Sequence, residues 1–220
     1  MLIAGVDDAG RGAIIGPLVI AGVLLDEKDI PKLVVLRVKD SKLLSPKRRE
    51  ELSGAIRELV LKYHVEKLWP REIDKVVNSH IKLQKLNRLE AQTMAKVIDA
   101  LKPDKAIVDA SDVNEVRYKE HILESLSYKP EVISEHKADR NYPIVSAASI
   151  IAKVERDKAI AELTRKFGEM GCGYPTDPQT IAFLENWLRQ YGEYPDFVRK
   201  SWKPAKKLKR EKATRQTRLE

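Results

Sequence analysis

The 220-residue sequence contains one cysteine, Cys172, and lacks any long apolar run. A single cysteine excludes an internal disulfide framework and fits a reducing compartment. No stretch approaches the roughly 18 apolar residues of a membrane span. The first residues run directly into strand-like sequence, without the basic region and cleavage site of a signal peptide. We therefore expect a cytoplasmic protein that has no membrane partner.

Motifs of several common sites are also missing. The sequence has no GxxxxGK[ST] segment, and "GVDDAGRG" lacks the GxGxxG spacing of a dinucleotide site. The histidines show no zinc-site spacing with Cys172; they are His64, His80, His121 and His136. The sequence therefore gives no support to a nucleotide-binding loop, a zinc centre or an activated thiol.

Charge is abundant but unevenly distributed. Apolar residues make up 43% and charged residues 34% of the chain, which is a globular composition with a net charge of +8. Residues 203–220 hold eight basic and two acidic side chains, a net +6 of that total. Such a basic tail either attracts a polyanion, most often a phosphate backbone, or only improves solubility, and both interpretations remain open.

Strand-like and helix-like segments alternate along the chain. Strands are predicted at 2–7, 18–25, 64–69, 105–110 and 131–136, and helices at 73–77, 86–101, 113–126, 143–167 and 178–191. A further helix begins at Ser45-Pro46, and its helical spacing includes Leu52, Ile56, Leu59 and Tyr63. The pattern predicts an α/β fold with a mixed sheet flanked by helices and a helical C-terminal portion.

Four carboxylates fall at or just beyond strand ends. Asp7 and Asp8 end the first strand, Asp109 ends "KAIVDA", and Asp139 follows a later strand in "EHKAD". Any one alone is typical of a polar turn residue, but several in one sheet indicate a site. Clustered carboxylates raise one another's pKa unless a cation compensates, and their oxygens suit Mg²⁺ or Mn²⁺. The pattern favours a two-metal phosphoryl-transfer site.

Seven segments carry a resemblance that covers about residues 2–203. They are "GVDDAGRG", "VKDSKLLSPKRRE", "VDASDV", "EHKAD", "VSAASIIAKVERD", "GCGYPTDPQT" and "VRKSWK". In this order they resemble ribonuclease HII, the type 2 ribonuclease H, in its archaeal form. The resemblance implies a ribonuclease H-like catalytic domain at 1–170, a helical substrate-binding portion at 171–202 and a basic tail at 203–220. It also implies metal-dependent endonucleolytic cleavage of RNA in RNA–DNA hybrids and at single ribonucleotides in duplex DNA, leaving 3′-hydroxyl and 5′-phosphate ends.

By this resemblance, Asp7, Asp109 and Asp139 match three of the family's four catalytic, metal-binding carboxylates. Asp8 departs from the pattern, because it stands where the family usually has glutamate. Its side chain is shorter by one C–C bond, about 1.5 Å, whereas Mg²⁺ tolerates little deviation from its octahedral contacts. Successive strand side chains also point to opposite faces. Either Asp8 binds through water or the local backbone compensates.

The resemblance also assigns residues that bind the substrate. Gly10, Arg11 and Gly12 match a turn that contacts the ribose 2′-hydroxyl, and Tyr174 matches a tyrosine that stacks on the sugar after the ribonucleotide. A tight turn without a ligand would leave the adjacent acids unexplained, whereas residue type alone would favour a packing role for the tyrosine. Candidate phosphate contacts are Lys39, Ser41 and Lys42, and weaker ones are Lys137, Ser146, Ser149 and Lys153. The weaker ones equally suit helix packing or charge balance.

Two alternative functions remain. One is a hybrid-binding protein catalytically impaired by Asp8, and the other is a 3′-to-5′ exonuclease, which would lack the Gly-Arg-Gly turn. The tail ends in "RQTRLE", where Gln216 and Leu219 open the pattern of a sliding-clamp-binding peptide without its aromatic pair. Because buried aromatics dominate such interfaces, we expect clamp binding to be weak or absent. We expect the protein to act as a monomer.

Overall fold

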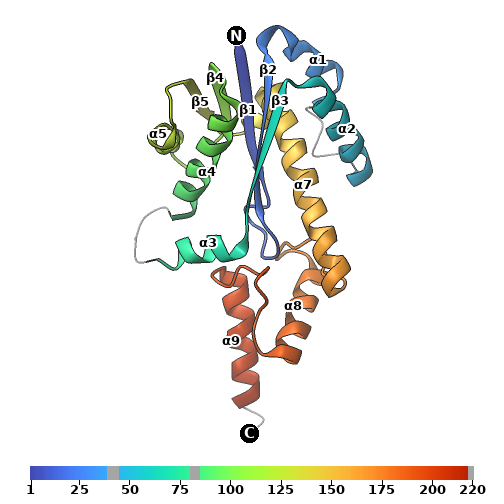
Figure 1. Cartoon of the computed structure of the whole chain (residues 1–220). Helices are drawn as coiled ribbons and strands as arrows, with labels where there is room; N and C mark the ends of the chain where they lie inside the picture. The colour runs from blue at the N-terminus through green and yellow to red at the C-terminus, as the bar shows by residue number, and fades with distance from the viewer. Residues whose placement is uncertain (39–44, 80–84, 218–220) are drawn as a thin grey trace. The chain divides into compact units, whose positions relative to one another are not determined.

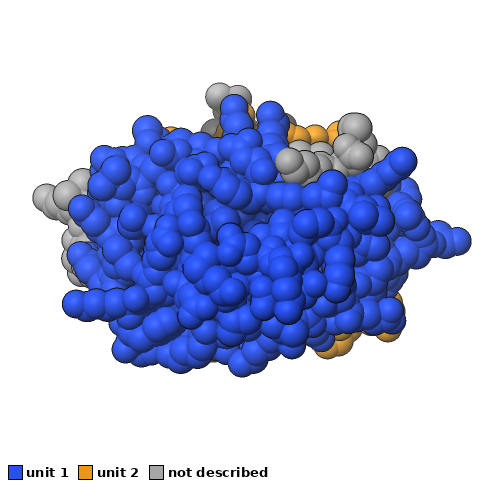
Figure 2. All heavy atoms as spheres, turned by 90° about the horizontal axis from the view of Figure 1, so that it is seen from above, with its two compact units in different colours: residues 1–9, 19–67, 83–155 blue, residues 10–18, 68–82, 156–220 orange. Residues whose placement is uncertain are grey.

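The computed structural model describes residues 1–38, 45–79 and 85–217, with side chains as far as residue 211. The chain forms two compact units that are interleaved along the sequence (Figure 2). Unit 1 comprises residues 1–9, 19–67 and 83–155, and unit 2 comprises residues 10–18, 68–82 and 156–220. The functional division into residues 1–170, 171–202 and 203–220 stays a prediction.

Unit 1 is built on a mixed five-stranded sheet with the order β3-β2-β1-β4-β5 (Figure 1). The strands are β1 (Leu2–Ala9), β2 (Leu18–Asp26), β3 (Lys62–Leu68), β4 (Lys105–Asp109) and β5 (Glu131–Glu135). β1 pairs antiparallel with β2 and parallel with β4, and β4 pairs parallel with β5. The mixed α/β sheet expected from the sequence is therefore confirmed.

Helices cover both faces of this sheet, α4 and α5 on one side and α2 and α7 on the other (Figure 1). Their bounds are α2 (Pro46–Leu59), α4 (Lys85–Leu101), α5 (Glu115–Ser125) and α7 (Pro143–Phe167). Strand side chains alternate between two cores, since Ile3 packs with the α2 and α7 residues and Val6 with the α4 and α5 residues. None of the helices described is long and apolar enough to cross a membrane.

Unit 2 contains the C-terminal part of α7 together with α3 (Pro70–Val77), α8 (Pro178–Tyr191) and α9 (Lys203–Thr217). Its own apolar core includes Ile14, Ile15, Met170, Leu184 and Phe197. An aromatic group strengthens this core; its rings are those of Phe167, Phe183, Trp187 and Phe197, with centroids 4.6–6.4 Å apart. The basic tail, to which the sequence assigned no secondary structure, forms α9, whose Ala205 is fully buried.

One local prediction from the sequence is wrong, and two short helices were not predicted. Tyr63 does not continue the helical face of α2, because α2 ends at Leu59 and Tyr63 lies in β3 with an exposed side chain. The two helices without a predicted counterpart are η1 (Glu27–Asp29) and α1 (Ile30–Val35). α1 starts with Ile30-Pro31, and a proline in the first turn suits a helix that has too few residues for a clear apolar period.

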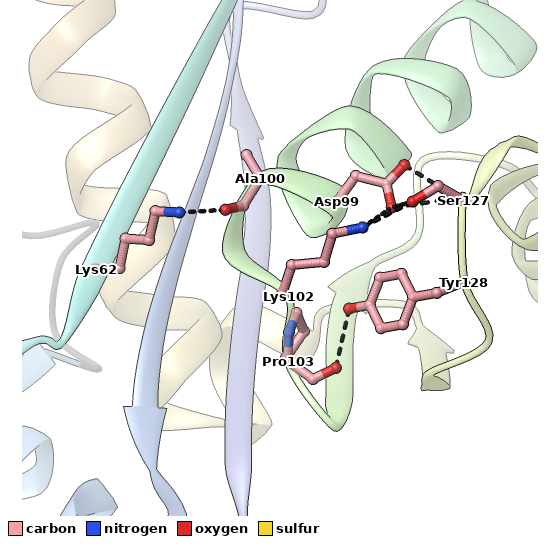
Figure 3. A network of polar contacts seen from close by, with 7 residues as sticks. All are labelled: Lys62, Asp99, Ala100, Lys102, Pro103, Ser127 and Tyr128. Carbon is pink, nitrogen blue, oxygen red and sulfur yellow. Dashed lines mark hydrogen bonds and ion pairs between the residues drawn. The ribbon is translucent and has the colours of Figure 1, made fainter.

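A network of polar contacts joins the segments that immediately precede β4 and β5 (Figure 3). Asp99 accepts hydrogen bonds from the Ser127 hydroxyl at 2.6 Å and from Lys102 at 3.1 Å. Burial raises the pKa of Asp99, but these bonds outweigh that cost and the net pKa is lowered. The Lys102 ammonium lies 4.3 Å from the ring centroid of Tyr128, whose hydroxyl donates to Pro103 O. This network fixes one end of the sheet, whereas Asp109 lies at the other end of β4.

Candidate active site

Asp7 and Asp109 lie side by side on two adjacent parallel strands, Asp109 at the end of β4 and Asp7 two residues before the end of β1. The β1–β4 register pairs Val6 with Val108, and Asp7 and Asp109 are the next residues of their strands. Asp7 lies four residues after Ile3 in β1, and Asp109 lies two residues after Ile107 in β4. Residues an even number of positions apart in a strand point to the same face, and both isoleucines belong to the core that includes α2 and α7 residues. The sheet therefore brings both carboxylates to the face that α7 covers.

The Asp7 carboxyl group has a pKa raised well above its usual range. Burial is the largest cause, since Asp7 is only 5% exposed, and repulsion from Asp8 and Asp109 adds to it. Hydrogen bonds from Ser149 and from the Asp8 amide, the latter at 2.7 Å, act in the opposite direction without overcoming it. A cation at this position would relieve the repulsion and favour the ionised carboxylate.

Asp8 follows Asp7 in β1, so its side chain leaves the strand on the opposite face of the sheet, as strand alternation predicts. Its Oδ2 accepts a 2.9 Å hydrogen bond from the hydroxyl of Ser111, which follows β4. Sequence analysis did not single out Ser111, although it lies inside the quoted segment "VDASDV". Repulsion from Asp8 contributes to the raised pKa of Asp7 although the two side chains leave β1 on opposite faces. The shorter acid is thus held by a specific donor.

Asp139 belongs to the short helix α6 (Ala138–Asn141), and its side chain is buried. The amide of the preceding Ala138 donates to Asp109 Oδ1 at 2.8 Å, which links this turn to β4. Lys137 adopts the left-handed conformation, with φ at 59°, and its side chain is exposed. The structure therefore connects the segment that carries Asp139 to Asp109 through a backbone hydrogen bond.

Three other predicted residues lie on α7. Ser146 and Ser149 are each 1% exposed; Ser146 donates to Asp139 O, and Ser149 accepts from Lys153 Nζ at 2.9 Å. Both serines thus serve contacts inside unit 1, and Ser149 reaches Asp7. Lys153 is half-buried. The predicted contacts of these residues with phosphate stay predictions, as does that of Lys137. Lys39, Ser41 and Lys42 lie outside the described residues.

The donor set suits a hard divalent cation, because it consists of carboxylate oxygens. Across residues 1–38, 45–79 and 85–217, no three acidic, histidine or cysteine side chains form a preassembled metal cage. Three of the carboxylates accept protein hydrogen bonds, Asp7 from the Asp8 amide, Asp8 from Ser111 and Asp109 from the Ala138 amide. Repulsion from Asp8 and Asp109 adds to burial in raising the pKa of Asp7, and a cation would offset that repulsion, so the residues fit a cation.

In unit 2, the Gly-Arg-Gly segment forms a tight turn closed by the Ala13 amide, which donates to Gly10 O at 3.2 Å. Gly10 is required by the protein itself, because its φ is +86° and a Cβ would lie 2.7 Å from Arg156 Cδ. Gly12 is different. Its φ is outside the left-handed region, and a Cβ there would meet no atom within 4 Å. Neither a left-handed φ nor packing against described atoms therefore requires glycine at this position.

Tyr174 lies in a tightly braced loop of unit 2. The Arg156 guanidinium lies 4.5 Å from the centroid of its ring and donates to Cys172 O at 2.6 Å. Asp177 accepts from the Cys172 amide at 2.6 Å, and this bond is the main cause that lowers the pKa of Asp177 to about 2. The loop is therefore rigid around a half-buried tyrosine that cation–π contact holds on one side.

Solved structures of other proteins share this architecture. The ribonuclease H2 structure from Pyrococcus horikoshii OT3 superposes with a TM-score of 0.88 at 45% identity, covering 96% of this chain and 98% of that one. A structure of the PCNA:RNase HII complex from Archaeoglobus fulgidus superposes with a TM-score of 0.83 at 42% identity, covering 92% and 96%. The sheet and its helices are those of a ribonuclease H-like nuclease.

The family follows from the sequence comparisons. The family model described as Ribonuclease HII matches residues 4–205. The ribonuclease HII of Thermococcus onnurineus (strain NA1) is 48% identical over 210 residues, which cover 94% of this chain and 90% of that protein. The chain belongs to the ribonuclease HII family. It is a metal-dependent endonuclease of this class, which hydrolyses phosphodiester bonds of RNA in RNA–DNA hybrids.

Proposed function

We propose that the chain also incises duplex DNA on the 5′ side of a single ribonucleotide, by two-metal catalysis, leaving 3′-hydroxyl and 5′-phosphate ends. The observation that carries this proposal is that the buried Asp7 lies beside Asp109 on adjacent parallel strands and next to Asp8, so that the three carboxylates repel one another. Such mutual repulsion is costly unless cations bind there. Phosphodiester hydrolysis is the chemistry that paired divalent cations on carboxylates perform.

Asp7, Asp8, Asp109 and Asp139 would hold Mg²⁺ or Mn²⁺. Bound divalent cations would supply a Lewis acid and an activated water for attack on phosphorus. The chain's own residues fix the ligands: Ser111 orients Asp8, the Ala138 amide orients Asp109, and Ser149 contacts Asp7. These donors limit how far each carboxylate can rotate, which is how supporting hydrogen bonds tune metal ligands.

Recognition of the ribonucleotide falls to the Gly-Arg-Gly turn and Tyr174. A backbone without a side chain at Gly12 can come close to a ribose, and an amide can bond to the 2′-hydroxyl that distinguishes RNA from DNA. Arg156 holds the Tyr174 ring by a cation–π contact, and the ring would stack on the next sugar with its other face. This division assigns sugar identity to the turn and junction preference to the tyrosine.

Helix α9 supplies a basic surface for the phosphate backbone. Its exposed side chains include Lys206, Lys207, Lys209 and Arg210. Some of this charge is balanced, because Lys209 lies 2.5 Å from a Glu193 carboxylate oxygen and Lys207 lies 3.8 Å from Glu211. Exposed pairs of this kind contribute little and exchange readily for phosphate.

One assay separates this function from the alternatives. The substrate is an end-blocked DNA duplex with one ribonucleotide, incubated with Mg²⁺ and separately with Mn²⁺. Internal incision 5′ of the ribonucleotide supports the proposal. Digestion only of unblocked ends would indicate an exonuclease, and binding without any cut in either metal would indicate a catalytically impaired binding protein.

We also propose that these 220 residues act as a monomer and bind a sliding clamp weakly. The relative from Archaeoglobus fulgidus has a structure titled as its complex with PCNA. The present sequence carries Gln216 and Leu219 without an accompanying aromatic pair. Light scattering of the chain, alone and mixed with a clamp ring, tests both statements. A stable complex or a dimer would contradict them.

A further inference from the structure

Arg199 is a fully buried arginine in unit 2. Its exposed fraction is 0%, and it is among the largest fully buried side chains of the described residues. It follows Val198, which forms an isolated antiparallel bridge with Ile15. A guanidinium is always charged and is costly to remove from water, so its position in a core calls for specific hydrogen bonds.

Those hydrogen bonds converge on the turn that contains Gly10 to Gly12. Arg199 Nη2 donates to Gly10 O and Nη1 donates to Arg11 O, each at 2.7 Å. Nε and Nη2 also donate to Gly16 O, at 3.3 and 3.2 Å. The Arg199 amide donates to Ile14 O at 2.9 Å. One guanidinium fork therefore holds three carbonyls of the segment 10–16.

Because peptide groups are planar, these hydrogen bonds to carbonyls also set the orientation of two amide N–H groups. In a trans peptide the C=O of one residue points opposite to the N–H of the next. Because Arg199 draws the carbonyls of Gly10 and Arg11 toward itself, the N–H groups of Arg11 and Gly12 are turned away from it. The carbonyl bonds also polarise the same peptide units, which strengthens their N–H groups as donors.

We propose that Arg199 is a positioning residue that sets ribose discrimination by orienting the Arg11 and Gly12 amides. This inference rests on the proposed recognition of the 2′-hydroxyl by the turn. Lysine cannot replace this function, because one ammonium at the end of a flexible stem does not reproduce a planar fork that reaches three carbonyls. Arg199 acts through the turn and touches no reacting atom itself.

The test is binding of two DNA duplexes that differ by a single 2′-hydroxyl, with Ca²⁺ in place of Mg²⁺, measured by fluorescence anisotropy. Arg199→Lys is compared with Arg189→Lys, an exposed arginine of α8 in the same unit. Arg199→Lys should reduce the preference for the ribonucleotide duplex by about 2- to 10-fold, the range of one hydrogen bond, while affinity for all-DNA duplex is unchanged. Arg189→Lys should keep the wild-type preference.

An unchanged preference in folded Arg199→Lys overturns the inference. A wild-type chain without any preference, and without incision of the ribonucleotide duplex, instead overturns the proposed function on which the inference rests. Should Arg199→Lys not fold, amide NMR spectra of the wild-type chain decide. The Arg11 and Gly12 signals must shift with the ribonucleotide duplex and stay unchanged with all-DNA duplex; equal shifts with both duplexes would overturn recognition of the 2′-hydroxyl by the turn, and the inference with it.

Discussion

Replacing Gly12 with alanine separates the ligand role of the turn from its folding role. Since φ at Gly12 is not left-handed and a Cβ would meet no atom within 4 Å, the methyl group adds no strain. Alanine at a compatible position stabilises a protein by about 0.4–1 kcal/mol, because the unfolded chain loses conformational freedom. The Gly12→Ala variant should therefore unfold at the wild-type temperature or slightly above it.

The cleavage rate of Gly12→Ala should fall although its stability does not. The added methyl group occupies the space through which a ribose would approach the turn, and a displacement of about 1 Å at a reacting centre costs about 10²-fold in rate. We expect kcat/KM on a single-ribonucleotide duplex to fall by about that factor, which corresponds to about 2.7 kcal/mol of transition-state stabilisation.

The matched control is Gly54→Ala in α2, where a Cβ also meets no atom within 4 Å. It should gain stability through helix propensity, up to about 1 kcal/mol, and keep full activity. Gly10→Ala provides the contrast, because its φ of +86° and the nearby Arg156 make it destabilising. Full activity in folded Gly12→Ala would refute the assignment of this glycine to substrate approach.

Three further changes test other parts of the account. Asp8→Glu should raise activity, most clearly in Mg²⁺, because the longer acid regains about 1.5 Å of reach; slower turnover in both metals would show that the Ser111 hydrogen bond already adapts the site to aspartate. Tyr174→Ala should weaken incision at a lone ribonucleotide more than in a continuous hybrid, and equal losses in the two initial rates would remove its junction role. Replacing Lys206, Lys207 and Arg210 together with glutamine should lower duplex affinity and reduce the salt slope by about 0.9 log unit per lost phosphate contact, without moving the cut. Substitution is preferable to deleting residues 206–220, because Leu208 packs against the unit 2 core. An unchanged duplex affinity of the substituted protein at low salt would show that α9 serves only solubility.

The sequence predicts the sheet because apolar periodicity determines which side chains face a core. The alternation in β1 predicts that Asp7 and Asp8 lie on opposite faces, and the cores that contain Ile3 and Val6 confirm this parity. The parallel pairing of β1 with β4 then explains why Asp7 and Asp109 become neighbours. Pattern and strand direction were sufficient for these features.

Residues that act through long-range hydrogen bonds were not predictable in this way. Arg199 binds carbonyls that lie more than 180 positions earlier in the chain, and its burial follows only from the assembled unit 2. Ser111 and Arg156 lie within the quoted segments, but nothing in their spacing indicates which groups they contact. Their roles depend on tertiary geometry, on which local sequence carries little information.

Helix α9 illustrates a different limit. Its high charge and low apolar content favour a solvated tail over a packed helix. A few residues suffice to anchor it, since Ala205 is buried in the unit 2 core and its carbonyl accepts from the Tyr194 hydroxyl at 3.1 Å. Burial also raises the pKa of Tyr194 to about 12. Tertiary contacts of this kind override a weak amphipathic signal.

The most direct test of the central claim maps the cut in a single-ribonucleotide duplex at nucleotide resolution, for the wild-type chain, Asp7→Asn and the control Glu131→Gln. Glu131 is an exposed carboxylate at the start of β5. Wild type and Glu131→Gln should cut 5′ of the ribonucleotide in Mg²⁺ or Mn²⁺. Asp7→Asn should bind the duplex with similar affinity but not cut it. In the absence of metal, this variant should unfold at no lower a temperature than wild type, because a neutral amide removes the repulsion from Asp8 and Asp109. Near-normal cleavage by Asp7→Asn would contradict the carboxylate metal site on which the account rests.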